Sequence, residues 1–285
     1  MSGELKQLDS SLFPPLLREI PDAPKQLYVR GELPHFEQRW LAVVGARALT
    51  PYGKQACEHL IRGLRGYPIV IVSGLAYGAD ACAHKAALEA GLPTVAVPGS
   101  GLDWSVMYPR ANVALAREII ARGGAHLSEF KPDQKAADYT FPQRNRIMAG
   151  MCHATLAIEA KERSGSLITA RLTTEYNREL LVVPGSIFSE TSRGTHQFLK
   201  LGATPVTEPE DILRALTIDP EARSTHTQNN LSEQECRVMA YLETPCSRDE
   251  LITALALPIS EASILLSTME IKGLIIEEFG FVRPV

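Results

Sequence analysis

The amino-acid sequence predicts an α/β protein, with a doubly wound, mostly parallel Rossmann-like sheet and a small C-terminal winged-helix domain. Three observations lead to this fold class. Five short apolar runs alternate with segments of helical periodicity, a pattern typical of parallel strands that are buried on both faces. A polar stretch follows near residue 220. After it come three short amphipathic segments and a final hairpin pattern.

The elements of the main domain follow in chain order. Residues 1–39 are expected to form an N-terminal extension that packs on this domain, which spans residues 40–219. Its predicted strands are rich in β-branched residues and cover residues 41–45, 69–74, 94–99, 155–158 and 180–185. Helical spacing of apolar residues is clearest over residues 52–65 and 79–90.

Residues 220–230 are polar, with nothing to bury in the run 224–230, and are expected to form a linker. The winged helix-turn-helix domain is expected over residues 231–285. Its three helices are predicted at residues 231–242, 247–256 and 260–272, with Ser232 and Ser247 as N-caps, and its hairpin at 274–282.

The two predicted domains differ in net charge. Residues 226–285 hold four basic residues against nine acidic ones, a net of −5, whereas the whole chain carries −4. Phosphate binding needs a positive surface, so the winged helix is expected to contact protein or to regulate rather than to bind duplex DNA. Residues 139–171 have a net charge of +3, which makes this window the candidate nucleic-acid site.

Composition excludes several classes of protein. A hydrophobic content of 45% and a charged content of 22% are those of an ordinary globular protein. Five cysteines without CxxC spacing indicate reduced thiols, and no histidine, cysteine or acid spacing predicts a metal site. With neither a signal peptide nor a long apolar run, the chain is expected to be cytoplasmic, with no membrane span.

Glycines end four of the predicted strands, at Gly45, Gly74, Gly99 and Gly185. Ligands of doubly wound folds bind outside the carboxyl ends of the strands, so these turns predict a ligand cleft, although each glycine alone is also explained by a tight turn. Neither GxGxxG nor GxxxxGK[ST] is present, which disfavours a dinucleotide site and a P-loop. No cofactor is expected.

Residues 141–167 combine an aromatic ring, two arginines, an amide and a Ser-Gly-Ser turn that opens a helix. Guanidinium groups match phosphate oxygens, and the first N–H groups of a helix bind the same kind of ligand. These residues therefore predict a phosphate-rich ligand.

The ordered motifs of the chain resemble those of the DNA-processing protein A (DprA/Smf) family. They lie at residues 44–47, 73–80, 108–109, 128–130, 141–146, 164–170 and 183–185. Tyr77 departs from the family pattern, where arginine is usual. The resemblance implies a single-stranded DNA-binding protein that is not an enzyme. It implies protection of incoming strands in natural transformation and recombination, loading of the RecA recombinase, homodimerisation and, as a further partner, single-stranded DNA-binding protein.

Carried onto this sequence, the resemblance and the basic window give a set of candidate nucleic-acid-binding residues. They are Arg47, Gly74, Phe141, Arg144, Asn145, Arg146, Lys161, Ser164, Gly165 and Ser166. Arginines are expected to bind phosphates, Phe141 to stack on a base, and the 164–166 turn to donate N–H groups.

Structural roles remain open for several of these residues. Arg47 is also explained by an ion pair at a strand end, Phe141 by core packing, and Asn145 by a helix N-terminal cap or a structural hydrogen bond. Arg146 is equally explained by an internal salt bridge to Glu159 or Asp138, and Lys161 by a solvated surface charge.

An enzyme is the rival hypothesis, and a purely structural partner-binding protein with a vestigial pocket is a third. Rossmann-like nucleotide phosphoribohydrolases also bind a phosphate at glycine-rich strand ends, and Glu129 and Glu159 lie where an acid would be needed. The signature PGGxGTxxE of that group is absent, which favours the DNA-binding interpretation.

Overall fold

The protein is described by a computed structural model that covers residues 3–162, 164–221, 232–242, 246–255, 257–271, 274–278 and 280–284. Two compact units are present, residues 1–223 and 224–285, and each is described by itself. Nearly all of the predicted linker, residues 222–230, lies outside the described residues.

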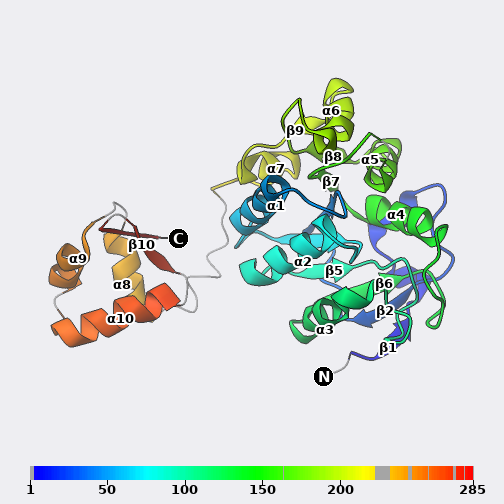
Figure 1. Cartoon of the computed structure of the whole chain (residues 1–285). Helices are drawn as coiled ribbons and strands as arrows, with labels where there is room; N and C mark the ends of the chain where they lie inside the picture. The colour runs from blue at the N-terminus through cyan, green and yellow to red at the C-terminus, as the bar shows by residue number, and fades with distance from the viewer. Residues whose placement is uncertain are drawn as a thin grey trace. The chain divides into compact units, whose positions relative to one another are not determined.

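The first unit is built on one nine-stranded sheet (Figure 1), with the strand order β1-β2-β6-β5-β4-β3-β7-β8-β9. The strands are β1 (Leu5–Gln7), β2 (Tyr28–Gly31), β3 (Arg39–Val44), β4 (Ile69–Ser73), β5 (Thr94–Ala96), β6 (Ala125–Ser128), β7 (Ala154–Ala157), β8 (Glu179–Val182) and β9 (Thr204–Pro205). In this spatial order, every pair of neighbouring strands from β6 through β5, β4, β3, β7 and β8 to β9 is parallel. Strand β2 is antiparallel to both of its neighbours, β1 and β6. The predicted mostly parallel sheet is confirmed.

Helices cover both faces of this sheet, as a doubly wound fold requires (Figure 1). They are α1 (Pro51–Gly63), α2 (Ala79–Ala90), α3 (Val113–Ala121), α4 (Thr140–Met151), α5 (Gly165–Glu175), α6 (Arg193–Lys200) and α7 (Pro209–Ala215). The short 3₁₀ helices are Ser10–Leu12, Pro15–Glu19, Arg110–Asn112 and Glu190–Ser192.

The two faces of β3 show how the sequence divides the core. Leu41 and Val43 point to the face covered by α1, α2 and α7, and Ala42 and Val44 to the face covered by α4 and α5. Both sets are buried, because side chains alternate between the two faces of a strand. This explains the continuous apolar run in the sequence.

The strand order reverses between β3 and β7. From β3 the chain proceeds through β4 and β5 to β6 on one side, and β7, β8 and β9 lie on the other. Ligand sites of open α/β sheets lie at such a point, beyond the carboxyl ends of the strands. The loops after β3 and β4 and the start of α5 meet here.

The N-terminal segment is more than the packing extension that the sequence predicts. Its strands β1 and β2 extend the sheet, with Leu5 opposite Arg30 and Val29 opposite Leu127. Sequence reasoning missed these strands and also β6 and β9, because none of them is a continuous apolar run.

The second unit contains α8 (Glu233–Tyr241), α9 (Arg248–Leu255), α10 (Ile259–Ile271) and the antiparallel pair β10 (Ile275–Glu278) and β11 (Phe281–Pro284). The Ser232 hydroxyl accepts a hydrogen bond from the Glu235 N–H, and the Ser247 hydroxyl from the Glu250 N–H. Both serines cap helices as predicted, and the three helices with a hairpin confirm a winged helix.

No single helix among the described residues has the length and apolar character needed to cross a membrane. Within the described ranges, one pair of helices, α9 with α10, reaches the required length and composition together, and this pair is bent by 120°.

Candidate nucleic-acid interface

A pocket of about 250 Å³ lies at the point where the strand order reverses. We call it the Arg47 pocket. Its walls come from the end of β3, the loop after β4, α4 and the start of α5. Among its lining residues are Arg47, Asp80, Phe141, Arg144, Asn145, Ser164, Gly165 and Ser166. The structure thus brings together seven of the ten candidate residues, separated by up to 119 positions in the chain.

Arg144 is buried on α4, with 6% of its surface exposed. Its Nη1 donates to the carbonyl oxygen of Gly74, at 2.6 Å, and to that of Val97. Its Nε donates to Asn145 Oδ1 at 3.1 Å. Much of the guanidinium is therefore used to join α4 to the ends of β4 and β5, while its charge remains in the pocket wall. Gly74 contributes its carbonyl and does not line the pocket.

Asn145 connects α4 to the turn that opens α5. It accepts from Arg144 Nε, and its Nδ2 donates to the carbonyl oxygen of Gly165 at 3.4 Å. It lies inside α4, so it is not a helix cap. Asn145 therefore positions the arginine and the turn relative to each other.

The Ser-Gly-Ser turn begins α5 as expected, with Ser164 at the N-cap position. The Ser166 hydroxyl donates to the carbonyl oxygen of Gly45 at 2.8 Å, which fixes the turn against the end of β3. The Ser164 hydroxyl is buried and has no hydrogen-bond partner among the described residues. This hydroxyl and the first N–H groups of α5 form a polar wall suited to an anion.

Arg47 and Phe141 form the other wall. The guanidinium carbon of Arg47 lies 5.0 Å from the centroid of the Phe141 ring, a favourable position for a cation over an aromatic face. Arg47 is exposed and makes no ion pair within the described part of the chain. Phe141 is half-buried and packs closely on Gly99. An accessible positive charge therefore lies directly over an aromatic ring.

Asp80 is a buried acid in the same pocket that sequence reasoning did not single out. Its Oδ2 accepts from the Ala76 N–H at 3.1 Å. Burial raises the pKa of its carboxyl and lowers the pKa of the Arg144 guanidinium, and attraction between the two groups opposes both shifts. The negative charge of Asp80 thus offsets the positive charge of Arg144. Arg47 remains as the other positive charge of the pocket. An acid at the start of a helix gave no sequence signal of its own.

Arg146 and Lys161 lie outside the pocket lining. Arg146 donates to the carbonyl oxygen of Asp22 at 2.7 Å and forms ion pairs with the carboxylates of Asp22 and Glu129. Its partners are not the acids that the sequence suggested. Lys161 is exposed, 3.7 Å from Glu190. Arg163, counted in the basic window, lies outside the described residues.

Glu159 follows β7 and is buried at the first turn of α1. It accepts hydrogen bonds from the Thr50 N–H at 3.0 Å, the Thr50 hydroxyl at 2.6 Å and the Thr191 hydroxyl at 3.1 Å. Thr50 is the N-cap of α1. In Rossmann-like folds the first helix often receives a ligand phosphate at this end. Here a carboxylate of the protein lies there instead.

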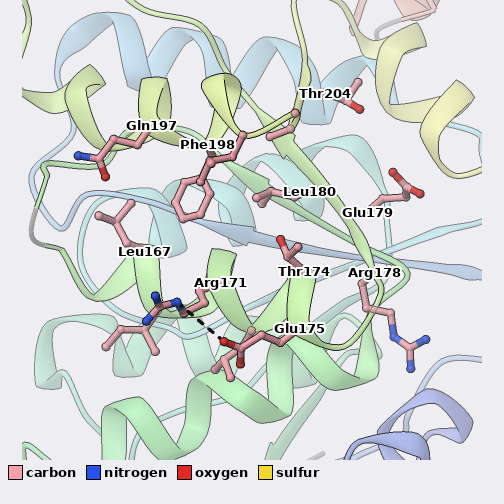
Figure 2. A pocket seen from close by; sticks show the side chains of 15 residues that line it. Leu167, Arg171, Thr174, Glu175, Arg178, Glu179, Leu180, Gln197, Phe198 and Thr204 are labelled. Carbon is pink, nitrogen blue, oxygen red and sulfur yellow. Dashed lines mark ion pairs between the residues drawn. The ribbon is translucent and has the colours of Figure 1, made fainter.

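A larger pocket of about 760 Å³ lies between α5, β8 and α6, and we call it the edge pocket. Figure 2 shows the Phe198 ring pointing into it, between Leu167 and Leu180, with the Arg171 and Glu175 ion pair on its rim. Within the described ranges, no group of histidine, cysteine and acidic residues is placed to hold a metal ion.

Two protein families match the chain. Residues 5–217 match the family described as DNA recombination-mediator protein A, and residues 221–278 match the one described as the DprA winged helix domain. Protein Smf of Escherichia coli is 43% identical over 208 residues, which are 73% of this chain and 55% of that protein. The chain thus spans just over half the length of this curated relative. DNA processing protein DprA of Streptococcus pneumoniae is 44% identical over 201 residues, 70% of each chain.

Solved structures show the same similarity. The X-ray structure of DNA processing protein A from Streptococcus pneumoniae has a TM-score of 0.68 and 39% identity, and the match covers 74% of each chain. The structure of DNA processing protein A from Helicobacter pylori, described for its single-stranded DNA binding mode, has a TM-score of 0.67 and 30% identity. This second match covers 76% of this chain and 98% of that one.

Proposed function

Because the chain belongs to the DNA recombination-mediator protein A family, we propose that it binds single-stranded DNA in the Arg47 pocket. In this proposal the protein acts in the cytoplasm without catalysis, protects incoming strands during natural transformation and recombination, and loads the RecA recombinase onto them. Single-stranded DNA-binding protein is a further proposed partner.

The observation that carries the proposal is the position of Arg47 over Phe141, 5.0 Å from the ring centroid. A strand presents phosphates and flat bases in alternation, and this pair offers an exposed guanidinium in contact with an aromatic ring. Stacking of a base on an aromatic side chain contributes about 1–3 kcal/mol and tolerates any base. The pair therefore suits binding that is independent of sequence.

The opposite wall completes the proposed site. The Ser164 hydroxyl, which has no hydrogen-bond partner in the described part of the chain, and the N-terminus of α5 would bind a second phosphate. Since paired bases are stacked within a duplex, Phe141 would reach only an unpaired base. This supports a preference for single strands.

Homodimerisation is proposed through the edge pocket. Leu201 on its rim is 81% exposed and Ile168 is 41% exposed, although both are apolar. Arginine and glutamate alternate on this surface, as in the Arg171 and Glu175 pair (Figure 2), so two copies would present complementary charges to each other. Two linked sites on one strand raise apparent affinity by about 100-fold or more where the geometry allows.

The net charge of the winged helix, −5 over residues 226–285, supports a protein-contact role for this unit. Duplex binding would require the opposite sign.

The rival enzyme hypothesis needs a free acid near the pocket. Both candidates are engaged in the structure: Glu129 pairs with Arg146, and Glu159 accepts three hydrogen bonds at the start of α1. This favours binding over catalysis.

The test is fluorescence anisotropy of labelled oligothymidine and of a matching duplex at two salt concentrations. The variant is Arg47→Ala, because Arg144 is part of the buried network and its loss would disturb the fold. Arg62→Ala, an exposed arginine at the far end of α1, is the matched control.

We expect the wild type and the control to bind the single strand more tightly than the duplex. Arg47→Ala should weaken single-strand binding about tenfold. It should also reduce the salt slope, which is the steepness with which log affinity falls with log salt concentration, by about 0.7, the value for one phosphate contact. Equally feeble binding of both nucleic acids by all three proteins would overturn the proposal. Nucleotide hydrolysis would then be the next assay.

A further inference from the structure

The loop that follows β5 brings a second aromatic ring to the Arg47 pocket. Tyr108 lies with its ring centroid 5.9 Å from that of Phe141, at an angle of 54°, and 40% of its surface is exposed. Its ring therefore continues the aromatic surface beyond Phe141, in the chain segment between β5 and α3.

Two arginines follow Tyr108 in the same direction. Arg110 donates from Nη1 to the Trp104 carbonyl oxygen at 2.9 Å, and from Nη2 to the carbonyl oxygen of Ser105. The guanidinium of Arg117, on α3, lies 4.6 Å from the centroid of the Trp104 ring. Both arginines are exposed, and both contact Trp104, Arg110 at its carbonyl oxygen and Arg117 at its ring.

These two positive charges are not neutralised by neighbouring acids. Neither Arg110 nor Arg117 forms an ion pair within the described ranges, and Glu118 on the same helix pairs with Arg122 instead. The nearby acid Asp103 interacts with Arg30, whose guanidinium carbon lies 5.1 Å from the centroid of the Trp104 ring. Within the described ranges both guanidinium groups are therefore exposed and free of ion pairs, and Arg110 keeps for a phosphate the N–H groups that its two carbonyl bonds do not use.

The loop is held in place from two sides. The Gly101 N–H donates to the carbonyl oxygen of Gln134, and the Asp103 N–H donates to that of Pro132. Asn112 Nδ2 donates to the carbonyl oxygen of Leu75 at 2.8 Å. The rings and arginines thus keep a fixed order without a ligand, which lowers the cost of ordering them on binding.

We propose that single-stranded DNA leaving the Arg47 pocket continues over Tyr108 and then along Arg110 and Arg117. These three residues form what we call the exit track. The inference rests on the proposed function, since it assigns the direction of the strand at that same site. Tyr108 stacks on the next base outward, and the two arginines bind the phosphates that follow.

Oligonucleotides of two lengths distinguish binding at the exit track from binding in the Arg47 pocket. Oligothymidines of about 4 and about 16 nucleotides span the usual site sizes for single-strand binding. The short strand reaches the pocket alone, and the long strand also covers the track. The variant is Arg110→Ala, Arg117→Ala, and the control is Arg62→Ala, Arg65→Ala, which removes the same charge at the far end of α1.

We expect the track variant to bind the short strand as the wild type does and the long strand about tenfold or more weakly. Its salt slope on the long strand should fall by about 1.4, the value for two phosphate contacts on single-stranded DNA. Arg110→Lys, Arg117→Lys should restore most of the slope, which a loss of fold would not allow.

Tyr108→Ala should weaken long-strand binding by about tenfold, and Tyr108→Phe should not. Tyr139→Ala is the control, because Tyr139 is exposed but makes no ring contact within the described ranges.

Equal loss for both strand lengths, or no loss for either, would overturn the exit track. If Arg47→Ala still weakened short-strand binding about tenfold, the proposed function would stand without the exit track. Absence of binding by the wild type would overturn both.

Discussion

Arg144 lies against Gly74 so closely that the glycine has no room for a side chain. The Arg144 Nη1 to Gly74 carbonyl distance is 2.6 Å, and a Cβ added to Gly74 would lie 1.9 Å from that nitrogen. Gly74 is therefore a steric requirement of the Arg144 network.

Gly74→Ala should lower the free energy of unfolding by about 1–3 kcal/mol, the usual cost of overpacking. It should also weaken single-strand binding, because Arg144 and Asn145 are displaced together. Urea unfolding and anisotropy measure the two effects. Gly165→Ala is the control: a Cβ there meets nothing within 4 Å, and alanine is favoured in helices, so stability should hold or rise. A Gly74→Ala protein as stable as the wild type would contradict this account.

The Phe141 ring should contribute through its aromatic face. Phe141→Leu keeps an apolar side chain against Gly99 but removes the surface on which a base stacks. We expect single-strand affinity to fall by about 1–3 kcal/mol. Stability should change by less than about 1.5 kcal/mol. Phe141→Tyr should bind nearly as well as the wild type. If leucine served equally well in the anisotropy assay, stacking would not be the mechanism.

Glu159 should matter for stability and not for the strand. Glu159→Ala leaves the Thr50 N–H and the hydroxyls of Thr50 and Thr191 without their acceptor, and each buried unsatisfied donor costs about 1–3 kcal/mol. Thermal unfolding should show a marked loss. The residual folded protein should bind oligothymidine as the wild type does. Intact stability with lost binding would instead place Glu159 in a ligand site.

Two buried histidines should make stability depend on pH. Burial lowers the pKa of His84 to about 3 and that of His126 to about 4. Both values lie below the ordinary value near 6.5, so the unfolded chain binds protons that the folded chain does not. Their contribution to stability is complete above pH 6.5 or so. It falls by about 1.4 kcal/mol per pH unit for each histidine as the pH drops toward 4.

Urea unfolding at pH 7 and pH 5 measures this slope. A variant with glutamine at both positions, His84→Gln, His126→Gln, should be less stable at either pH but should show a shallower dependence. Equal wild-type stability at the two pH values would contradict the prediction.

The sequence predicted five of the parallel strands and seven of the residues that line the pocket, because glycine turns and apolar runs are local signals. Two of these strands, β5 and β8, end three residues before the predicted glycine. It did not predict how those residues are used. Arg144 looked like a free phosphate ligand, yet its guanidinium binds carbonyl oxygens of residues 70 and 47 positions away. Arg146 pairs with Asp22 and Glu129, which no spacing along the chain suggests. Tyr108 gained its significance only from its distance to Phe141.

The bonds of Arg146 have a practical consequence for the smallest protein that would retain the pocket. Helix α4 carries Phe141, Arg144 and Asn145, and it is anchored through Arg146 to the backbone of Asp22. A truncated version that starts at the first parallel strand would lose this anchor, together with the antiparallel strands at the sheet edge. The minimal module therefore includes the N-terminal segment, as a brace for the helix on which the pocket is built.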